Sequence, residues 1–241
     1  MKYAKYEPKF NGKGERASGK DYSMQIEDLE GKSDDSFIHL YFAKDHRKLM
    51  FLSIDFLIGF INENKSKNIL SLGAGPCINE YILKMCIPPD CKITATDFNS
   101  FQIKRANKFF KNITAKEFDF TKDDVKKLGN NFDLVIFLHS SFTMNDYEFL
   151  HLIVELKKLG VKHIIDFSGL MPIKRIPKQI FEDIWFKFKN RLETDKKTNG
   201  KILGYVRSKG EIRKLYQKAG LKVVDEVDIG IPNYRIFVIE V

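Results

Sequence analysis

The sequence predicts an α/β fold, with a mostly parallel sheet that ends in an antiparallel hairpin. Between residues 68 and 167, short apolar runs alternate with stretches of helical periodicity. Alternation at these lengths is typical of parallel βαβ units. The chain then closes with two strand-like runs joined only by residues 230–233. So short a link joins antiparallel neighbours, because parallel strands need a long crossover.

Each element is expected where the apolar pattern changes its period from strand-like to helical. The expected strands of the alternating part are residues 68–72, 92–96, 114–118, 133–138 and 162–167, and the expected helices are 79–85, 101–111 and 147–159. Residues 134–137 are Leu-Val-Ile-Phe, and a strand so apolar needs helices over both faces, as in the centre of a parallel sheet. At the end of the chain, a helix over 209–219 closed by Gly220 precedes strands over 222–229 and 235–241.

The chain is expected to have two parts, an N-terminal cap and a larger α/β domain. Residues 1–64 comprise a polar arm followed by a helical pattern over about 37–62, and residues 65–241 form the main domain. Residues 171–205 stand outside the strand–helix alternation. They are predicted to be an insertion that includes a helix near 179–192.

Composition suits a soluble globular protein, with 43% hydrophobic and 30% charged residues among 241. No apolar run is long enough to cross a bilayer, so no membrane association is expected. Three cysteines without CxxC spacing argue against a disulfide framework and a zinc site, and a cytoplasmic location is the default. The net charge of +9 comes from scattered lysines and is interpreted as a solvated surface, which makes a nucleic-acid partner the less favoured one.

The most informative segment is the turn after the first strand, Leu72-Gly73-Ala74-Gly75. Glycines let the backbone approach a ligand without a Cβ clash, and the helix that follows offers its N-terminal amides. Asp97 ends the second strand about 20 residues later, where nucleotide-binding sheets place a carboxylate for the ribose hydroxyls. Each feature also has a structural explanation, because Asp is a good helix N-cap and the glycines could form a tight turn without a ligand. The two features together indicate a nucleotide site.

This series of motifs resembles the class I S-adenosylmethionine-dependent methyltransferases. Residues 70–77 look like their glycine motif, Asp97 like their ribose acid, 117–120 like the motif near adenine, and 132–139 like the strand that lines the transfer site. The resemblance covers about residues 65–241. It implies a Rossmann-like three-layer sandwich with seven strands, S-adenosylmethionine as cofactor and S-adenosylhomocysteine as product. The cofactor contacts that it implies are Leu72, Gly73, Ala74, Gly75, Asp97, Phe98, Asp119, Phe120 and His139.

Three positions depart from common patterns. Family members often carry an acid where this chain has Ser71, so no negative charge is expected there. Cys77 stands where the glycine motif often has its third small residue. A nicotinamide fingerprint would need a small residue at Ile78, which favours S-adenosylmethionine over a dinucleotide.

Catalytic candidates are sought beyond the carboxyl ends of the strands, where open α/β sheets bind ligands. His139 follows the fourth strand and is the first candidate base for a hydroxyl acceptor. Asp166 is the second and weaker candidate, since alternation could turn it away from the site. Tyr22, Arg47 and Trp185 are weak candidates for a substrate lid, with ordinary surface or core roles as the alternative. No compact cluster of acids suggests a metal site.

The favoured function is methyl transfer to the oxygen or nitrogen of a small-molecule acceptor, which could be anionic. An RNA methyltransferase acting on ribose or base is the alternative that the basic charge raises. The fourth strand lacks an Asn/Asp-Pro-Pro-aromatic tetrad and a Pro-Cys pair, which disfavours transfer to a base. A protein that binds S-adenosylmethionine without catalysis, or a nicotinamide oxidoreductase, are the other hypotheses.

Overall fold

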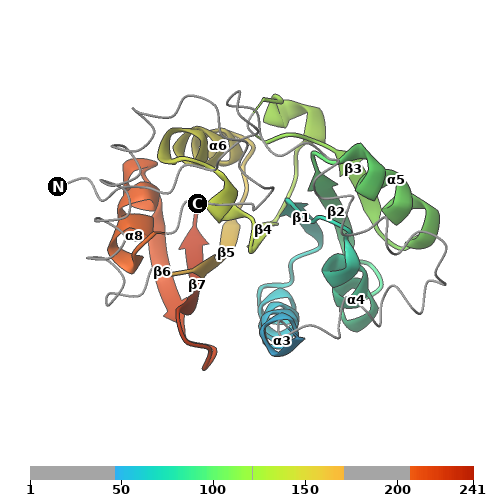
Figure 1. Ribbon diagram of the computed structural model, residues 1–241, viewed down its shortest axis with the longest axis horizontal. Helices are drawn as coiled ribbons and strands as arrows, with labels where there is room; N and C mark the ends of the chain where they lie inside the picture. The colour runs from blue at the N-terminus through green and yellow to red at the C-terminus, as the bar shows by residue number, and fades with distance from the viewer. Residues whose placement is uncertain (1–46, 121, 171–206) are drawn as a thin grey trace, which may run out of the picture.

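The computed structural model describes residues 47–120, 122–170 and 207–241, with Arg47 described by its backbone. Strands and helices alternate as the sequence predicts (Figure 1). The elements are α3 (Arg47–Asn64), β1 (Asn68–Leu72), α4 (Ile78–Cys86), β2 (Lys92–Asp97), α5 (Ser100–Phe109), β3 (Thr114–Glu117), η1 (Val125–Leu128), β4 (Leu134–Leu138), η2 (Ser141–Thr143), α6 (Asp146–Lys158), β5 (His163–Gly169), α8 (Lys209–Lys218), β6 (Lys222–Val227) and β7 (Tyr234–Glu240).

The seven strands form one sheet in the order β3-β2-β1-β4-β5-β7-β6. Strands β1 to β5 are parallel, whereas β7 runs antiparallel to both β5 and β6. The mostly parallel sheet with a terminal antiparallel hairpin is therefore confirmed. Because β1 lies between β2 and β4, the strand order reverses there, and open α/β sheets bind ligands at such a switch point.

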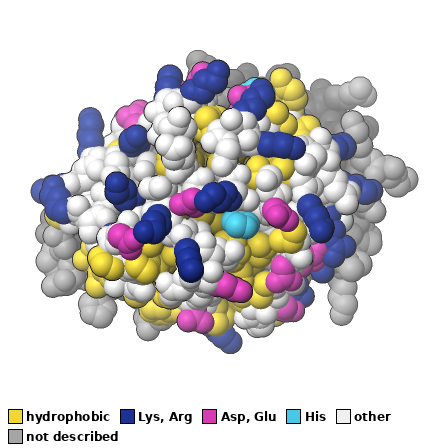
Figure 2. All heavy atoms as spheres, turned by 180° about the vertical axis from the view of Figure 1, so that it is seen from behind, with side chains coloured by type: hydrophobic (Ala, Val, Ile, Leu, Met, Phe, Trp, Pro, Cys, Tyr) yellow, Lys and Arg dark blue, Asp and Glu magenta, His cyan; other side chains and the backbone are white. Residues whose placement is uncertain are grey.

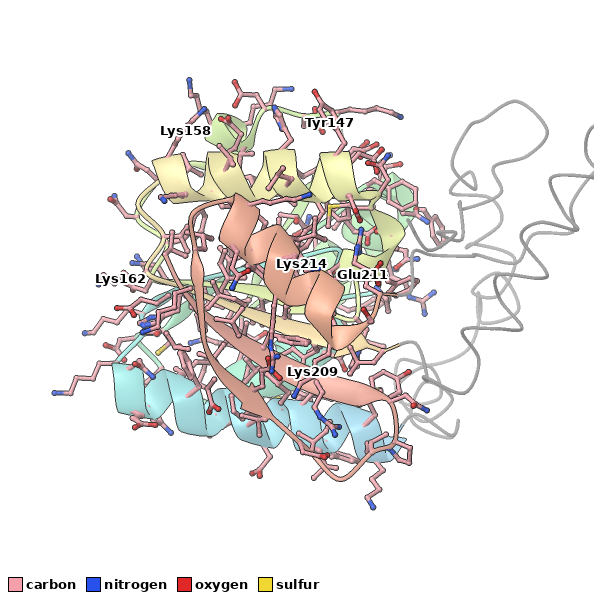
Figure 3. The ribbon with its side chains drawn as sticks, turned by 90° about the vertical axis from the view of Figure 1, so that its left-hand side faces the viewer. Tyr147, Lys158, Lys162, Lys209, Glu211 and Lys214 are labelled. Atoms are coloured by element: carbon pink, nitrogen blue, oxygen red, sulfur yellow. The ribbon has the colours of Figure 1, made fainter. Side chains whose placement is uncertain are left out.

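Helices cover both faces of the sheet and give three layers. One apolar cluster joins the sheet to α3, α4 and α5, and it includes Leu57, Ile78 and Ile103. A second cluster joins the opposite face to η1, α6 and α8, and it includes Phe149 and Tyr216. Figure 3 shows α6 and α8 on one side of the strands and α3 on the other. The predicted sandwich is confirmed, and the fully buried strand β4 lies at its centre.

Local caps explain where the site-bearing helices begin. Asn145 and Glu148 form a reciprocal capping box at α6, and Ser208 and Glu211 form another at α8. The Asn99 side chain accepts from the first backbone N–H groups of α5. These caps fix the loops that follow β2 and β4, so they help to hold the carboxyl edge of the sheet.

Most predicted boundaries hold within two residues. The expected early helix over 37–62 is seen only from Arg47, and it continues to Asn64. The polar arm and the insertion over 171–205 lie outside the described residues. None of the described helices is long and apolar enough to cross a membrane.

Candidate functional site

The glycine turn follows β1 and opens α4 with an unusual run of left-handed backbone. Gly73 has φ +70° and Gly75 has φ +55°, values that glycine adopts without a Cβ penalty. A Cβ on Gly73 would lie 2.6 Å from the Cβ of Ser140 and 3.2 Å from the ring of Phe120. Only glycine fits this contact between β1, β3 and β4. Cys77, the third small position of the motif, is also left-handed at φ 58° and buried.

Asp97 connects the glycine turn to the loop after β2. One carboxylate oxygen accepts from the backbone N–H of Gly75 at 2.9 Å, and the other accepts from Asn99 at 2.9 Å. Burial raises the pKa of this carboxyl, and the two backbone donors oppose that rise. A carboxylate accepts about four hydrogen bonds in all. Each oxygen of Asp97 therefore keeps a lone pair for a ligand hydroxyl. Ala74 completes the connection, because its N–H donates to the carbonyl of Thr96 at 2.8 Å.

The end of β3 adds the residues predicted near adenine. The N–H of Phe118 donates to the carbonyl of Asp97 at 3.0 Å, which fixes the segment that follows. Asp119 is partly buried, forms an ion pair with Lys122 at 3.4 Å, and is close enough to Asp97 for their charges to interact. Phe120 packs beside Gly73. Asp97 and Phe120 thus lie beside the glycine turn, and Asp119 lies close to Asp97. Their contacts with a cofactor stay a prediction.

His139 follows β4 in a left-handed conformation, with φ 59°. Such backbone costs a residue other than glycine about 1–2 kcal/mol, and strain of this kind is concentrated at functional sites. The imidazole lies 5.6 Å from the ring of Tyr234 and 6.0 Å from that of Phe167, measured between centroids. The ring therefore sits beyond the carboxyl edge of β4, toward β5 and β7. Its neighbour Ser140 turns back toward Gly73, and the Ser140 hydroxyl donates to the carbonyl of Leu72.

Asp166 lies on β5 and faces α8 rather than the open edge of the sheet. It is fully buried and accepts hydrogen bonds from Ser141 at 2.7 Å, Ser168 at 2.8 Å and Tyr216 at 3.1 Å. Burial raises the pKa of the Asp166 carboxyl, while the three hydroxyl donors favour its charged form. Through these hydrogen bonds the Asp166 carboxylate joins β5 to the β4–α6 loop and to α8, which is a structural role. Its role as a base stays a prediction.

The other candidates are placed only in part. Arg47 begins α3, and its side chain is not described; Tyr22 and Trp185 lie outside the described residues. Within the described ranges, no three His, Cys, Asp or Glu side chains are arranged to hold a metal ion. Cys77, Cys86 and Cys91 are all free thiols.

Two residues of this region were not singled out from the sequence. Arg207 is 5% exposed and clamps the loop after β4, donating to the Asp146 carboxylate at 3.0 Å and to the carbonyl of Met144 at 2.7 Å. Glu80 is 2% exposed and accepts from Ser71 at 2.7 Å. The helical period could have placed Glu80 on the inner face of α4, but a glutamate is normally assigned to the outer face.

This chain is similar in structure to several solved methyltransferases. Over 73% of this chain, the mitomycin 7-O-methyltransferase MmcR superposes with a TM-score of 0.55 at 15% identity. Human N-acetylserotonin methyltransferase matches 89% of it with a TM-score of 0.56 at 18% identity. The magnesium protoporphyrin IX methyltransferase ChlM from Synechocystis matches 91% of it with a TM-score of 0.57 at 13% identity. The fold is that of the class I methyltransferases.

The extent of the match differs among these proteins. This chain spans 49% of the mitomycin enzyme and 61% of the human enzyme, but 96% of ChlM. No protein-family model and no curated protein match the sequence. The similarity to these solved structures is one of fold, at 13–18% identity.

Proposed function

We propose that this protein transfers a methyl group from S-adenosylmethionine to the oxygen or nitrogen of a small-molecule acceptor. The observation that carries the proposal is the glycine turn at the switch point of the sheet, tied by Gly75 to the buried carboxylate of Asp97. Steric closeness excludes any side chain at Gly73. The same carboxylate keeps lone pairs for the hydroxyls of a ribose.

The residues present fit the cofactor. The left-handed turn at Gly73 and Gly75 would hold the amino-acid part of the cofactor, and Asp97 can accept from the ribose hydroxyls. Asp119 and Phe120 would contact the adenine. When bound, S-adenosylmethionine supplies an electrophilic methyl carbon on a sulfonium. What remains for the protein is to align the acceptor and to exclude water.

The acceptor is proposed to bind beyond the carboxyl ends of β4 and β5. His139, Phe167 and Tyr234 form an aromatic group there. For a hydroxyl acceptor, His139 would take the proton as the new bond forms. The similar solved enzymes are named for small-molecule acceptors, which supports the same class here. The proposal extends to an anionic acceptor. The free cysteines support a reducing, cytoplasmic compartment.

The alternatives are an RNA methyltransferase and a binding protein without turnover. On the face shown in Figure 2, lysine and arginine side chains are interspersed with acids rather than gathered in one field. RNA-binding surfaces gather positive charge on one face or stripe. This distribution favours the small-molecule acceptor on that face.

The test is calorimetric titration of the full chain with S-adenosylhomocysteine and, separately, with NADH. We expect S-adenosylhomocysteine alone to bind. A folded sample that binds NADH instead would contradict the proposal, and one that binds S-adenosylhomocysteine yet methylates no acceptor in a broad panel would favour the non-catalytic alternative.

A further inference from the structure

A buried carboxyl group lies under the glycine turn. Glu80 is in the first turn of α4, and only 2% of it is exposed. One of its oxygens, Oε1, accepts from the hydroxyl of Ser71 on β1 at 2.7 Å. The other, Oε2, is buried without a hydrogen-bond partner in the described part of the chain.

Two other buried side-chain oxygens, one on α4 and one on α5, also lack donors. The side-chain oxygens of Asn79 and Gln102 have no hydrogen-bond partner among the described residues. The Gln102 oxygen lies 3.3 Å from where a Cβ of Gly75 would be. Most buried acceptors in folded proteins are satisfied, because an unsatisfied one costs about 1–3 kcal/mol. An unpaired carboxylate oxygen in the first turn of α4 and an unpaired amide oxygen beside Gly75 point to a ligand that brings N–H donors.

The electrostatics favour a donor that is positively charged. Burial raises the pKa of the Glu80 carboxyl to about 7. The Ser71 hydroxyl and the backbone N–H of Glu80 itself oppose the rise, and the charge of Asp97 adds to it. The buried thiol of Cys77 stays neutral, since burial raises its pKa. On α3, which packs against α4, the charged side chains Lys48, Asp55 and Glu63 are exposed to solvent. A cation at Oε2 would stabilise the charged carboxylate, and no described side chain supplies one.

We infer that Glu80 binds the positively charged amino group of the cofactor's amino-acid part, with Ser71 as the positioning residue that orients the carboxylate. The inference rests on the proposed function and names a contact within the same site. An ammonium has N–H donors and a positive charge, which suits the unpaired carboxylate oxygen of Glu80. The carboxylate thus comes from α4 rather than from β1, where the sequence has Ser71.

The test compares two ligands that differ in the amino-acid part, which includes the amino group. S-Adenosylhomocysteine carries the amino-acid part, whereas 5′-methylthioadenosine lacks it. Glu80→Gln keeps the size of the side chain and an oxygen for Ser71 but removes the charge. In titrations of the full chain, we expect this variant to bind S-adenosylhomocysteine about tenfold more weakly or worse, the loss typical of a charged hydrogen bond. Its affinity for 5′-methylthioadenosine should be unchanged.

The matched control is Glu155→Gln, which removes one acid from the exposed Glu155–Lys158 pair on α6. It should alter neither affinity. The wild-type affinity for S-adenosylhomocysteine should also fall as pH drops below about 7, because Glu80 then takes up a proton. Glu80→Gln should lack that part of the pH dependence.

A double variant that moves the carboxylate from residue 80 to residue 71 gives a second test, for use if Glu80→Gln alone does not fold. Ser71→Asp combined with Glu80→Gln moves the carboxylate to β1, and it should restore much of the affinity for S-adenosylhomocysteine. Equal losses for both ligands in Glu80→Gln, or no loss for either, would overturn the inference. A wild-type protein that binds neither ligand would overturn the proposed function itself, which is a different result from either of these.

Discussion

Gly73→Ala tests the geometry on which the site depends. The new Cβ would lie 2.6 Å from the Cβ of Ser140, and the backbone there has φ +70°. The left-handed conformation costs about 1–2 kcal/mol for a residue with a Cβ, and overpacking costs about 1–3 kcal/mol. We therefore expect the free energy of unfolding to fall by about 2–5 kcal/mol. Affinity for S-adenosylhomocysteine should fall as well, because β1 and β4 must separate at the site.

Gly160→Ala provides the control. Gly160 follows the C-cap of α6 and has φ +74°, almost the same backbone conformation as Gly73, but no neighbouring heavy atom lies within 4 Å of its added Cβ. This variant should lose only the conformational part, about 1–2 kcal/mol. Urea unfolding followed by circular dichroism measures both variants under one set of conditions.

Removal of the clashing atom gives a second measurement. Ser140→Gly deletes the Cβ that Gly73→Ala would meet. The double variant should therefore lose less unfolding free energy than the two single variants lose together. The steric argument would be refuted if the alanine variants of Gly73 and Gly160 lost equal stability. It would also be refuted if the two changes at Gly73 and Ser140 were simply additive.

Four other predictions concern single side chains. In Asp97→Ala, a folded sample should bind S-adenosylhomocysteine about tenfold more weakly or worse, as expected for lost charged hydrogen bonds; unchanged affinity would contradict the ribose role. His139→Ala should slow turnover on a hydroxyl acceptor by about 10²–10⁴-fold with little change in cofactor affinity, and an unchanged rate would make His139 structural. Arg207→Ala should cost about 3–5 kcal/mol in urea unfolding, because it leaves buried acceptors unpaired, whereas Arg213→Ala on the exposed side of α8 should cost about 1 kcal/mol or less. Burial raises the pKa of Glu80 from 4.5 to about 7, so the folded protein binds a proton at Glu80 more tightly than the unfolded chain does. The stability that this proton binding adds is fully present below pH 4.5 and is lost as the pH rises through 7. The difference in unfolding free energy between wild type and Glu80→Gln should change by on the order of 3 kcal/mol across this window, and a flat difference would contradict it.

The elements of the fold could be predicted from the sequence because they depend on local patterns. The apolar run 134–137 marked a strand covered on both faces, and β4 is fully buried. The link 230–233 marked an antiparallel hairpin, and β6 pairs with β7 in that way. Glycine at a strand–helix turn and an acid at the end of the next strand were sufficient to indicate Gly73 and Asp97. In each case the physical signal lies within a few neighbouring residues.

The contacts that complete the site were decided only by the tertiary structure. Ser140 meets Gly73 because β1 lies beside β4, and strand order is not encoded in any local pattern. Asp166 could be proposed as a base from its position, but the face of β5 that it occupies turned it toward Tyr216. Ser71 indicated a missing charge, whereas packing of α4 on the sheet brought Glu80 to the same place. The sequence determined which residues form each element, and the order and packing of those elements determined which side chains meet.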